Sequence, residues 1–317
     1  MALSLEQYAL VYLDTRGLPW PAMPKVEAPK AKPSLQNLPV RAVLWTVYGS
    51  LLAIPTGELQ FESHLDFVTD AALDKTVLEF KMWNAMSRKP GAPSAQLKEM
   101  FKKSYDTLRL SGSGGEKHPE IPAERIWEDI VKKLVAREYA IDAAQYGSPA
   151  EFARKIAYFY HASIQGTGCY PGAADTLKLL ADRGIQQGLL ADGQCFTPVQ
   201  LLRGLRTQDP GFDLAMIFPA PLRSISAECK ARKPSTAIFQ AAITALAARG
   251  IAPSETLHVG SHLARDIAPA KKLGMKTALF AGDKASLVAT GDRLKDPATR
   301  PDVLLTELPQ LLDVIGN

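Results

Sequence analysis

Hydrophobic positions divide the chain into stretches with different periods. A short apolar run of strand-forming residues at 42–45 leads into the small, turn-forming group Tyr48-Gly49-Ser50, so residues 41–52 are predicted to hold a first buried strand and the loop after it. From about 58 to 165 apolar residues recur at the spacing of amphipathic helices. After residue 166 short apolar runs alternate with helical segments, which is typical of an α/β domain.

The alternation after residue 166 predicts a parallel sheet with helices on both faces. Because one strand precedes the helical stretch and the others follow it, the helical stretch is predicted to be an insertion that emerges beside the first strand. The predicted fold is therefore α/β, a Rossmann-like parallel sheet with an inserted all-helical cap domain. The core comprises 41–57 and 166–317, and the cap comprises 58–165. The further strands are predicted at 186–193, 214–220, 256–262 and 276–282, and the further helices at 173–181, 234–248 and 263–273.

Residues 1–40 are predicted to form an N-terminal arm. Six prolines between residues 19 and 39 exclude a helix or a central strand there, so the segment is expected to run extended. Tyr12 and Trp20 are the residues expected to pin it to the rest of the molecule.

Composition and charge exclude several classes of function. The 317 residues are 46% hydrophobic and 22% charged, as in an ordinary globular protein with room for two domains. The net charge is +4 and no basic run is interleaved with aromatic residues, so nucleic-acid binding is not predicted. Glu6 and Asp14 interrupt any apolar leader, and no stretch is long and apolar enough to span a membrane. Three cysteines without metal-type spacing favour a reducing, cytoplasmic location.

Four segments together resemble the haloacid dehalogenase superfamily, in its branch with a helical cap. They are VLWTVYGSLL (43–52), CYPGAADTLKLLADRGIQQGLLADG (169–193), ARKPSTAIFQAA (231–242) and LHVGSHLARDIAPAKKLGMKTALF (257–280). Their order and spacing over residues 41–285 match that family, which implies a small-molecule hydrolase with its site at the C-terminal ends of the strands.

The first two motifs of the family depart from the pattern in this sequence. The resemblance implies an Asp nucleophile at the end of the first strand, and Thr46 stands there. The position two residues on is Tyr48, as in the dehalogenase branch. The second motif implies a Ser or Thr that holds the transferred group, and Ala191 stands there, followed by Asp192 and Gly193.

The last two motifs are partly retained. The resemblance implies a Lys in the third motif, and Lys233 is present. It implies a pair of acids spaced by five in the fourth motif. The first of these is Ser261, as in the dehalogenase branch, and the second is Asp266.

These departures predict a degenerate catalytic site. A carboxylate is already anionic at neutral pH, whereas the hydroxyl of Thr46 needs a neighbouring base, and the first loop has no His. Magnesium demands several hard oxygen ligands. Because Thr46 and Ser261 replace two of the family's acids and Asp266 alone remains, magnesium is not expected.

The residues that remain suggest an anion-binding pocket. Pro234 suits the first turn of a helix, which would place Lys233 near its N-cap. Lys233, Asp266, Ser50 and the loop at Gly193 are the candidate ligand-binding residues, with a buried Lys233–Asp266 ion pair as an equal structural alternative. The Thr46 hydroxyl is expected to bond to nearby backbone.

Other reactive side chains have simpler structural interpretations. His262 is expected at the start of a helix, and Cys195 is expected to be a buried structural thiol. Arg88 and Lys89 could reach a substrate from the cap or lie in solvent. Trp83 and Trp127 are predicted to lie in the cap core.

Three functions therefore remain open. The leading hypothesis is a non-catalytic protein that binds an anionic small molecule or a protein partner in the old crevice. The first alternative is an active hydrolase, phosphatase-like or dehalogenase-like, with a reassigned nucleophile. The second is a structural or interaction protein whose crevice is filled by its own side chains. The sequence does not indicate an oligomeric state.

Overall fold

A six-stranded parallel sheet forms the centre of the core. The computed structural model describes residues 2–86, 92–111 and 114–316. The strand order is β5-β4-β1-β6-β7-β8, and every neighbouring pair is parallel. The strands are β1 (Ala42–Trp45), β4 (Gln186–Ala191), β5 (Arg223–Ile225), β6 (Thr256–Gly260), β7 (Lys276–Phe280) and β8 (Val303–Leu305). The predicted Rossmann-like parallel sheet is confirmed.

Helices cover both faces of this sheet. Because side chains alternate along a strand, Val43 and Trp45 of β1 pack into one apolar cluster, whereas Ala42 and Leu44 pack into another. The first cluster is completed by α7 (Ala173–Asp182), α8 (Thr197–Gln208), α9 (Leu214–Ile217) and α14 (Leu311–Val314). The second is completed by α11 (Thr236–Ala247) and α12 (Ala268–Lys272). Two short helices, α10 (Ser226–Cys229) and α13 (Gly291–Lys295), lie in the connections.

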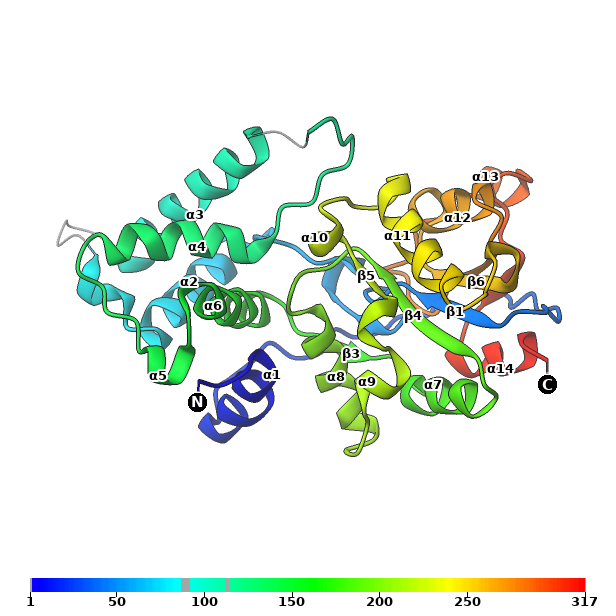
Figure 1. Cartoon of the computed structure of the whole chain (residues 1–317), viewed down its shortest axis with the longest axis horizontal. Coiled ribbons are helices and arrows are strands. Elements are labelled where there is room, and N and C mark those ends of the chain that lie inside the picture. The colour runs from blue at the N-terminus through cyan, green and yellow to red at the C-terminus, as the bar shows by residue number, and fades with distance from the viewer. Residues whose placement is uncertain (1, 87–91, 112–113, 317) are drawn as a thin grey trace.

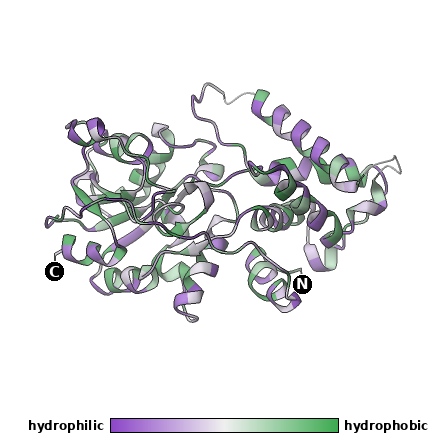
Figure 2. Ribbon diagram, turned by 180° about the vertical axis from the view of Figure 1, so that it is seen from behind, coloured by the Kyte–Doolittle hydropathy of each residue, from purple (hydrophilic) through white to green (hydrophobic). Residues whose placement is uncertain are grey.

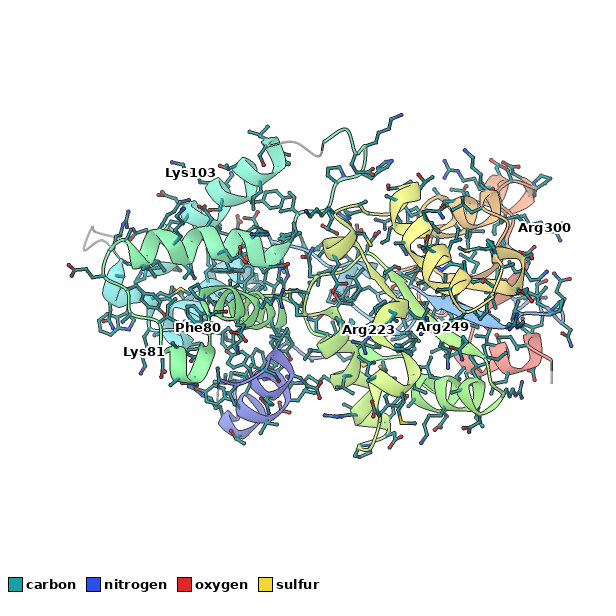
Figure 3. All side chains as sticks on the ribbon, viewed as in Figure 1. Phe80, Lys81, Lys103, Arg223, Arg249 and Arg300 are labelled. Carbon is teal, nitrogen blue, oxygen red and sulfur yellow. The ribbon has the colours of Figure 1, made fainter. Side chains whose placement is uncertain are left out.

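A separate group of helices makes up the cap, drawn in cyan to green in Figure 1. Among the described residues of 58–165 there is no strand. A large aromatic cluster that includes Phe80, Phe101, Trp127 and Tyr160 fills its interior; Phe80 is labelled in Figure 3. The outer helix α3 is mainly hydrophilic (Figure 2). The cap helices are α2 (Asp66–Glu79), α3 (Pro93–Leu110), α4 (Ala123–Val135), α5 (Ala143–Tyr146) and α6 (Pro149–Ile164).

The two connections between core and cap lie side by side. Strand β2 (Leu52–Ala53) leaves the core, β3 (Gly168–Cys169) returns to it, and the two pair antiparallel. The cap is thus inserted just beyond β1, so that it lies over the carboxyl edge of the sheet.

The arm connects the cap with the core. It begins with α1 (Leu5–Gln7) and a π-helical turn, and the Tyr12 ring stacks on Tyr8 with centroids 5.6 Å apart. Trp20 packs edge-on against Phe159 of the cap at 5.4 Å. Further along, Ser34 pairs with Leu304 beside β8. The predicted contact of Trp20 with the rest of the molecule is confirmed, whereas the stacking of Tyr12 on Tyr8 lies within the arm itself.

Several predicted elements are wrong. Residues 214–220 form no strand: the Asp213 carboxylate accepts from the backbone N–H groups of Ala215 and Met216 and starts the short helix α9 instead. The strand is β5, a few residues later, and β8 was not predicted. Helix α11 begins at Thr236 with Ser235 as its N-cap, so Pro234 is not in its first turn.

The predictions for individual cap residues have mixed outcomes. Trp127 is fully buried as predicted, whereas Trp83 is 55% exposed, because the chain leaves α2 for a short 3-10 turn there. Arg88 and Lys89 lie outside the described residues. None of the helices among the described residues is long and apolar enough to cross a membrane.

Candidate functional site

The motif residues gather at the carboxyl edge of the sheet, beneath the cap. Thr46 follows β1, Ala191 ends β4 and Ser261 follows β6. Lys233 comes from the loop before α11, and Asp266 comes from the π-helical turn Leu263–Ile267 after β6. Parallel strands bring these distant segments together because their carboxyl ends share one edge.

Three of these side chains form a closed, buried group. The Lys233 Nζ lies 2.5 Å from Asp266 Oδ1 and donates to Thr46 Oγ1 at 2.7 Å. The Thr46 hydroxyl also lies 3.4 Å from Asp266 Oδ1. All three residues are at most 7% exposed. The expectation that the Thr46 hydroxyl bonds to backbone is therefore wrong, because its partners are the side chains of Lys233 and Asp266.

The Asp266 carboxylate is saturated with donors. Its Oδ2 accepts from the backbone N–H groups of Ser261 at 3.0 Å and His262 at 2.9 Å, in addition to the contacts at Oδ1. Burial would raise the pKa of Asp266, but the Lys233 ammonium and the neighbouring His258 outweigh it and hold the pKa well below its usual range. Gly260 makes room for this carboxylate, since a Cβ there would lie 2.5 Å from it.

His258 is a site residue that sequence reasoning missed. It lies in the middle of β6 and is fully buried; its Nδ1 lies 3.1 Å from the Leu44 carbonyl oxygen and its Nε2 lies 3.8 Å from Asp266 Oδ1. Burial lowers its pKa, so the ring is neutral at pH 7. The sequence did contain a sign of this role, because His258 is a polar residue inside the apolar run 256–260.

The loop after β1 is fixed by the core. The Tyr48 hydroxyl lies 3.0 Å from Thr197 Oγ1 and donates to Gln200 Oε1 at 2.5 Å, both on α8. Burial raises its pKa far above the usual value, so the phenol stays neutral. Ser50 is fully buried and its hydroxyl donates to the Thr46 carbonyl oxygen. Ser50 therefore uses its proton within the chain and does not line the crevice, contrary to the prediction.

The polar groups of the second motif are also bonded to other groups of the protein. Ala191 is fully buried, the amide N–H of Gly193 donates to Ser226 Oγ at 2.9 Å, and Asp192 Oδ1 accepts from the backbone N–H of Lys233 at 2.8 Å. The loop amide at Gly193 that was predicted to meet an anion is thus already bonded.

The prediction for His262 is confirmed, and that for Cys195 holds in part. His262 is the N-cap of the turn after β6, where its Nδ1 accepts from the N–H groups of Ala264 and Arg265. Cys195 is partly buried and packs against the cap cluster, and burial raises the pKa of its thiol well above its usual value.

Charged residues that the sequence did not single out close the crevice. Glu58, in the segment leading to the cap, contacts Arg265 at 2.9 Å and Arg232 at 3.8 Å. Arg232 also lies 3.6 Å from Glu120, whose carboxylate accepts from Ser226 Oγ at 2.6 Å. Burial raises the pKa of Glu120 to about 7. These residues lie far apart in the sequence, so nothing in the sequence indicated that they would meet.

The crevice that remains is small and is not positively charged. Its volume is about 50 Å³, enough for a few waters or a small ion. Three cationic side chains line it, against four acidic ones: Arg232, Lys233 and Arg265, and Glu58, Glu120, Asp192 and Asp266. The predicted net attraction for anions at Lys233 does not hold for this crevice.

The donor set does not suit magnesium, which the family resemblance implies. Both oxygens of Asp266 and one oxygen of Asp192 already accept hydrogen bonds from protein groups, and Thr46 and Ser261 provide no carboxylate. Within residues 2–86, 92–111 and 114–316 there is no cluster of three or more His, Cys, Asp or Glu that could hold a metal ion.

With this geometry, the fold and the site define the class of the protein. A family model described as haloacid dehalogenase-like hydrolase matches residues 74–274, and the chain belongs to that family. The matched region includes Lys233 and Asp266 and begins after Thr46.

Two similar proteins are phosphatases, and a dehalogenase of known structure shares the fold. The chain is 33% identical to the glyceraldehyde 3-phosphate phosphatase of Pyrococcus furiosus over 46% of its own length and 53% of that protein. It is 30% identical to the phosphoserine phosphatase of Thermus thermophilus over 61% of its own length and 68% of that protein. The chain thus spans about half to two thirds of these relatives. The 2-haloacid dehalogenase of Pseudomonas syringae pv. Tomato DC3000 has the same fold, with a TM-score of 0.52 and 18% identity over 87% of this chain and 97% of that one.

Proposed function

We propose that this member of the haloacid dehalogenase-like hydrolase family has lost hydrolysis by a carboxylate nucleophile and acts by binding an anionic small molecule or a protein partner. The observation that carries the proposal is the closed group of Thr46, Lys233 and Asp266. In it the lysine is paired with the protein's own carboxylate and the nucleophile's position holds a neutral hydroxyl.

The surroundings of Thr46 do not activate its hydroxyl. A nucleophilic hydroxyl needs a nearby base to take its proton. The carboxylate within reach is Asp266, and a carboxylate whose pKa is held so low is a weak base. The Nε2 atom of His258 has no hydrogen-bond partner among the described residues and lies 3.8 Å from the Asp266 carboxylate, so it is not bonded to the Thr46 hydroxyl as a base would be.

The relatives support the anionic class of ligand. The two curated relatives named above act on phosphate esters, as their names state. A binding protein that descends from such enzymes would keep a preference for ligands with an anionic group, although it no longer cleaves them.

One contact favours a second candidate, an active hydrolase that uses Thr46. The 2.7 Å distance between Lys233 Nζ and Thr46 Oγ1 is within the range of a nucleophilic hydroxyl and a lysine base. That role requires a neutral amine, whereas the carboxylate 2.5 Å away stabilises the ammonium form. The ion pair therefore places this candidate second.

Turnover assays separate the two. We expect the purified protein to show no turnover on a panel of phosphate esters and 2-haloacids, with and without magnesium, and Thr46→Ala to behave identically. Thr46→Asp, alone and combined with Ala191→Ser, tests whether the missing carboxylate restores slow attack. Activity in the unmodified protein that Thr46→Ala abolishes would establish the second candidate and overturn the first.

A further inference from the structure

A second, larger cavity lies between the cap and the core. Its volume is about 560 Å³, within the range of roughly 300–1,000 Å³ typical of ligand pockets. It is lined by the end of α3, the start of α4, the segment 119–122 and the loop 230–232. We call it the cap–core groove. Figure 1 shows the connection from α3 to α4 descending beside α10, where Pro119 pairs with Ala231.

The cap–core groove is strongly cationic. Four of its lining side chains are basic, Arg109, Arg125, Lys230 and Arg232, and Glu120 is the acid among the lining residues. Because burial raises the pKa of Glu120 to about 7, that carboxyl is partly neutral at physiological pH.

Arg232 is paired with Glu58 and Glu120, whereas the other three cations are weakly neutralised by the protein. Arg109 and Arg125 contact acids on their own helices, Asp106 at 3.8 Å and Glu128 at 2.9 Å, and both arginines are exposed. Such surface pairs contribute about 0–1 kcal/mol and are readily exchanged. Lys230 has no carboxylate within ion-pair distance among the described residues.

The groove also offers an apolar and aromatic surface. Phe61, Tyr105, Leu108 and Ile121 line it and are partly buried. The rings of Phe61 and Tyr105 lie 5.3 Å apart at 54°, which holds both in place. Phe61 and Arg232 also line the catalytic crevice, so the two cavities share a wall.

We infer that the cap–core groove is the ligand site, and that it takes an anion with an aromatic or branched apolar body. The anionic group meets Arg109, Arg125 and Lys230, and the apolar body lies on Phe61 and Tyr105. The inference rests on the proposed function and deepens it, because it moves the ligand away from Lys233. The catalytic crevice, at about 50 Å³ and with its lysine paired, does not accommodate such a molecule.

Calorimetric titration of the full chain with 1-naphthyl phosphate tests this site. We expect saturable one-to-one binding, with 1-naphthol and inorganic phosphate each binding at least tenfold more weakly, because each provides one half of the interaction. The double variant Arg109→Gln/Arg125→Gln should weaken binding at least tenfold. Leu108→Asn should also weaken it, with less dependence on salt.

The matched control is Arg137→Gln, an exposed arginine just beyond the C-terminal end of α4 and absent from the groove. It should change affinity less than threefold. Equal weakening by the control and the double variant, or undiminished binding by the double variant, would overturn the groove as the site. Absence of binding to the unmodified protein would do the same.

The two proposals fail in distinguishable ways. Release of 1-naphthol from 1-naphthyl phosphate during the titration would contradict the proposal that hydrolysis has been lost. The groove variants would still show where the ligand binds. Thr46→Ala, which lies outside the groove, should leave the affinity unchanged. A large loss of affinity in Thr46→Ala would place the ligand in the crevice instead.

Discussion

Asp266 and Glu120 are two buried carboxyl groups whose pKa values are shifted in opposite directions. Both are nearly inaccessible to water. Asp266 has a lysine at 2.5 Å and two amide donors, so its pKa is lowered. Glu120 has an arginine no closer than 3.6 Å, one hydroxyl donor at 2.6 Å and one amide donor, from Ile121, at 3.0 Å, so the loss of hydration dominates and its pKa is raised to about 7.

Glu120 should therefore make stability depend on pH. Between its ordinary pKa of 4.5 and about 7 the folded state holds a proton that the unfolded state has released. The contribution of Glu120 to the free energy of unfolding should consequently fall as pH rises through this window, by up to about 1.4 kcal/mol per unit, and level off above it. Buried His161, whose pKa burial lowers to about 3, contributes with the opposite sign below its ordinary pKa of 6.5. Glu120→Gln removes this contribution, so the free energy of unfolding of the variant should rise relative to that of the unmodified protein as pH increases from 4.5 to about 7, as measured by urea unfolding at pH 4.5 to 8.

The control for this experiment is Glu99→Gln, an exposed glutamate on α3. It should leave the slope unchanged. A slope in Glu120→Gln equal to that of the unmodified protein would show that another group causes the dependence.

At the level of elements, N-caps decide where several helices begin. The Ser148 hydroxyl accepts from the Glu151 N–H, and the Glu151 carboxylate accepts from the Ser148 N–H, with Pro149 in the first turn. This capping box starts α6, which packs against α2 and α4 and carries much of the cap's aromatic cluster.

Removal of that cap should weaken the helical domain. We expect Ser148→Ala to lower the free energy of unfolding by about 1 kcal/mol, because one N–H at the helix start loses its acceptor. Ser148→Thr keeps the hydroxyl and should lose much less. Denaturant titration followed by circular dichroism measures both, and an equal loss in the two variants would contradict the capping role.

On the scale of the whole molecule, the arm ties two separate hydrophobic clusters together. Tyr8 and Leu13 are buried in the cap cluster, whereas Leu38 and Val40 are buried in the core cluster. Arg203 of α8 reaches Asp14 at 2.5 Å and lies over the Trp20 ring at 5.8 Å. In Figure 1 the arm's first helix lies beneath α6 and beside α8, so the arm bridges the cap and the core on the side away from the groove.

The arm should accordingly contribute to global stability. Leu13→Ala should lower the free energy of unfolding by about 2–4 kcal/mol, because it leaves a cavity beneath the arm. Val11→Ala, at a position that is 60% exposed in the same turn, should change it by less than about 0.5 kcal/mol. Hydrogen exchange should show the loss of protection in both cap and core; equal effects of the two variants would show that the arm is not packed as described.

The sequence by itself determined the architecture. Continuous apolar runs such as 42–45 and 256–260 predict buried parallel strands, and the helical period over 58–165 predicts an insertion, because both patterns are local consequences of side-chain spacing. The family motifs also identified Thr46, Lys233 and Asp266, since each stands at a fixed place relative to a strand or a helix.

Only the tertiary structure decided what these residues contact. Glu58, Glu120 and Arg232 come from separate segments, and a charged residue in a loop gives no sign of a partner more than 50 positions away. The same holds for the bond from Lys233 to Thr46, which spans 187 positions. Short strands such as β8 were missed because three residues carry too little pattern. Electrostatics in a fold depends on distance and burial, and both arise only when the chain has packed.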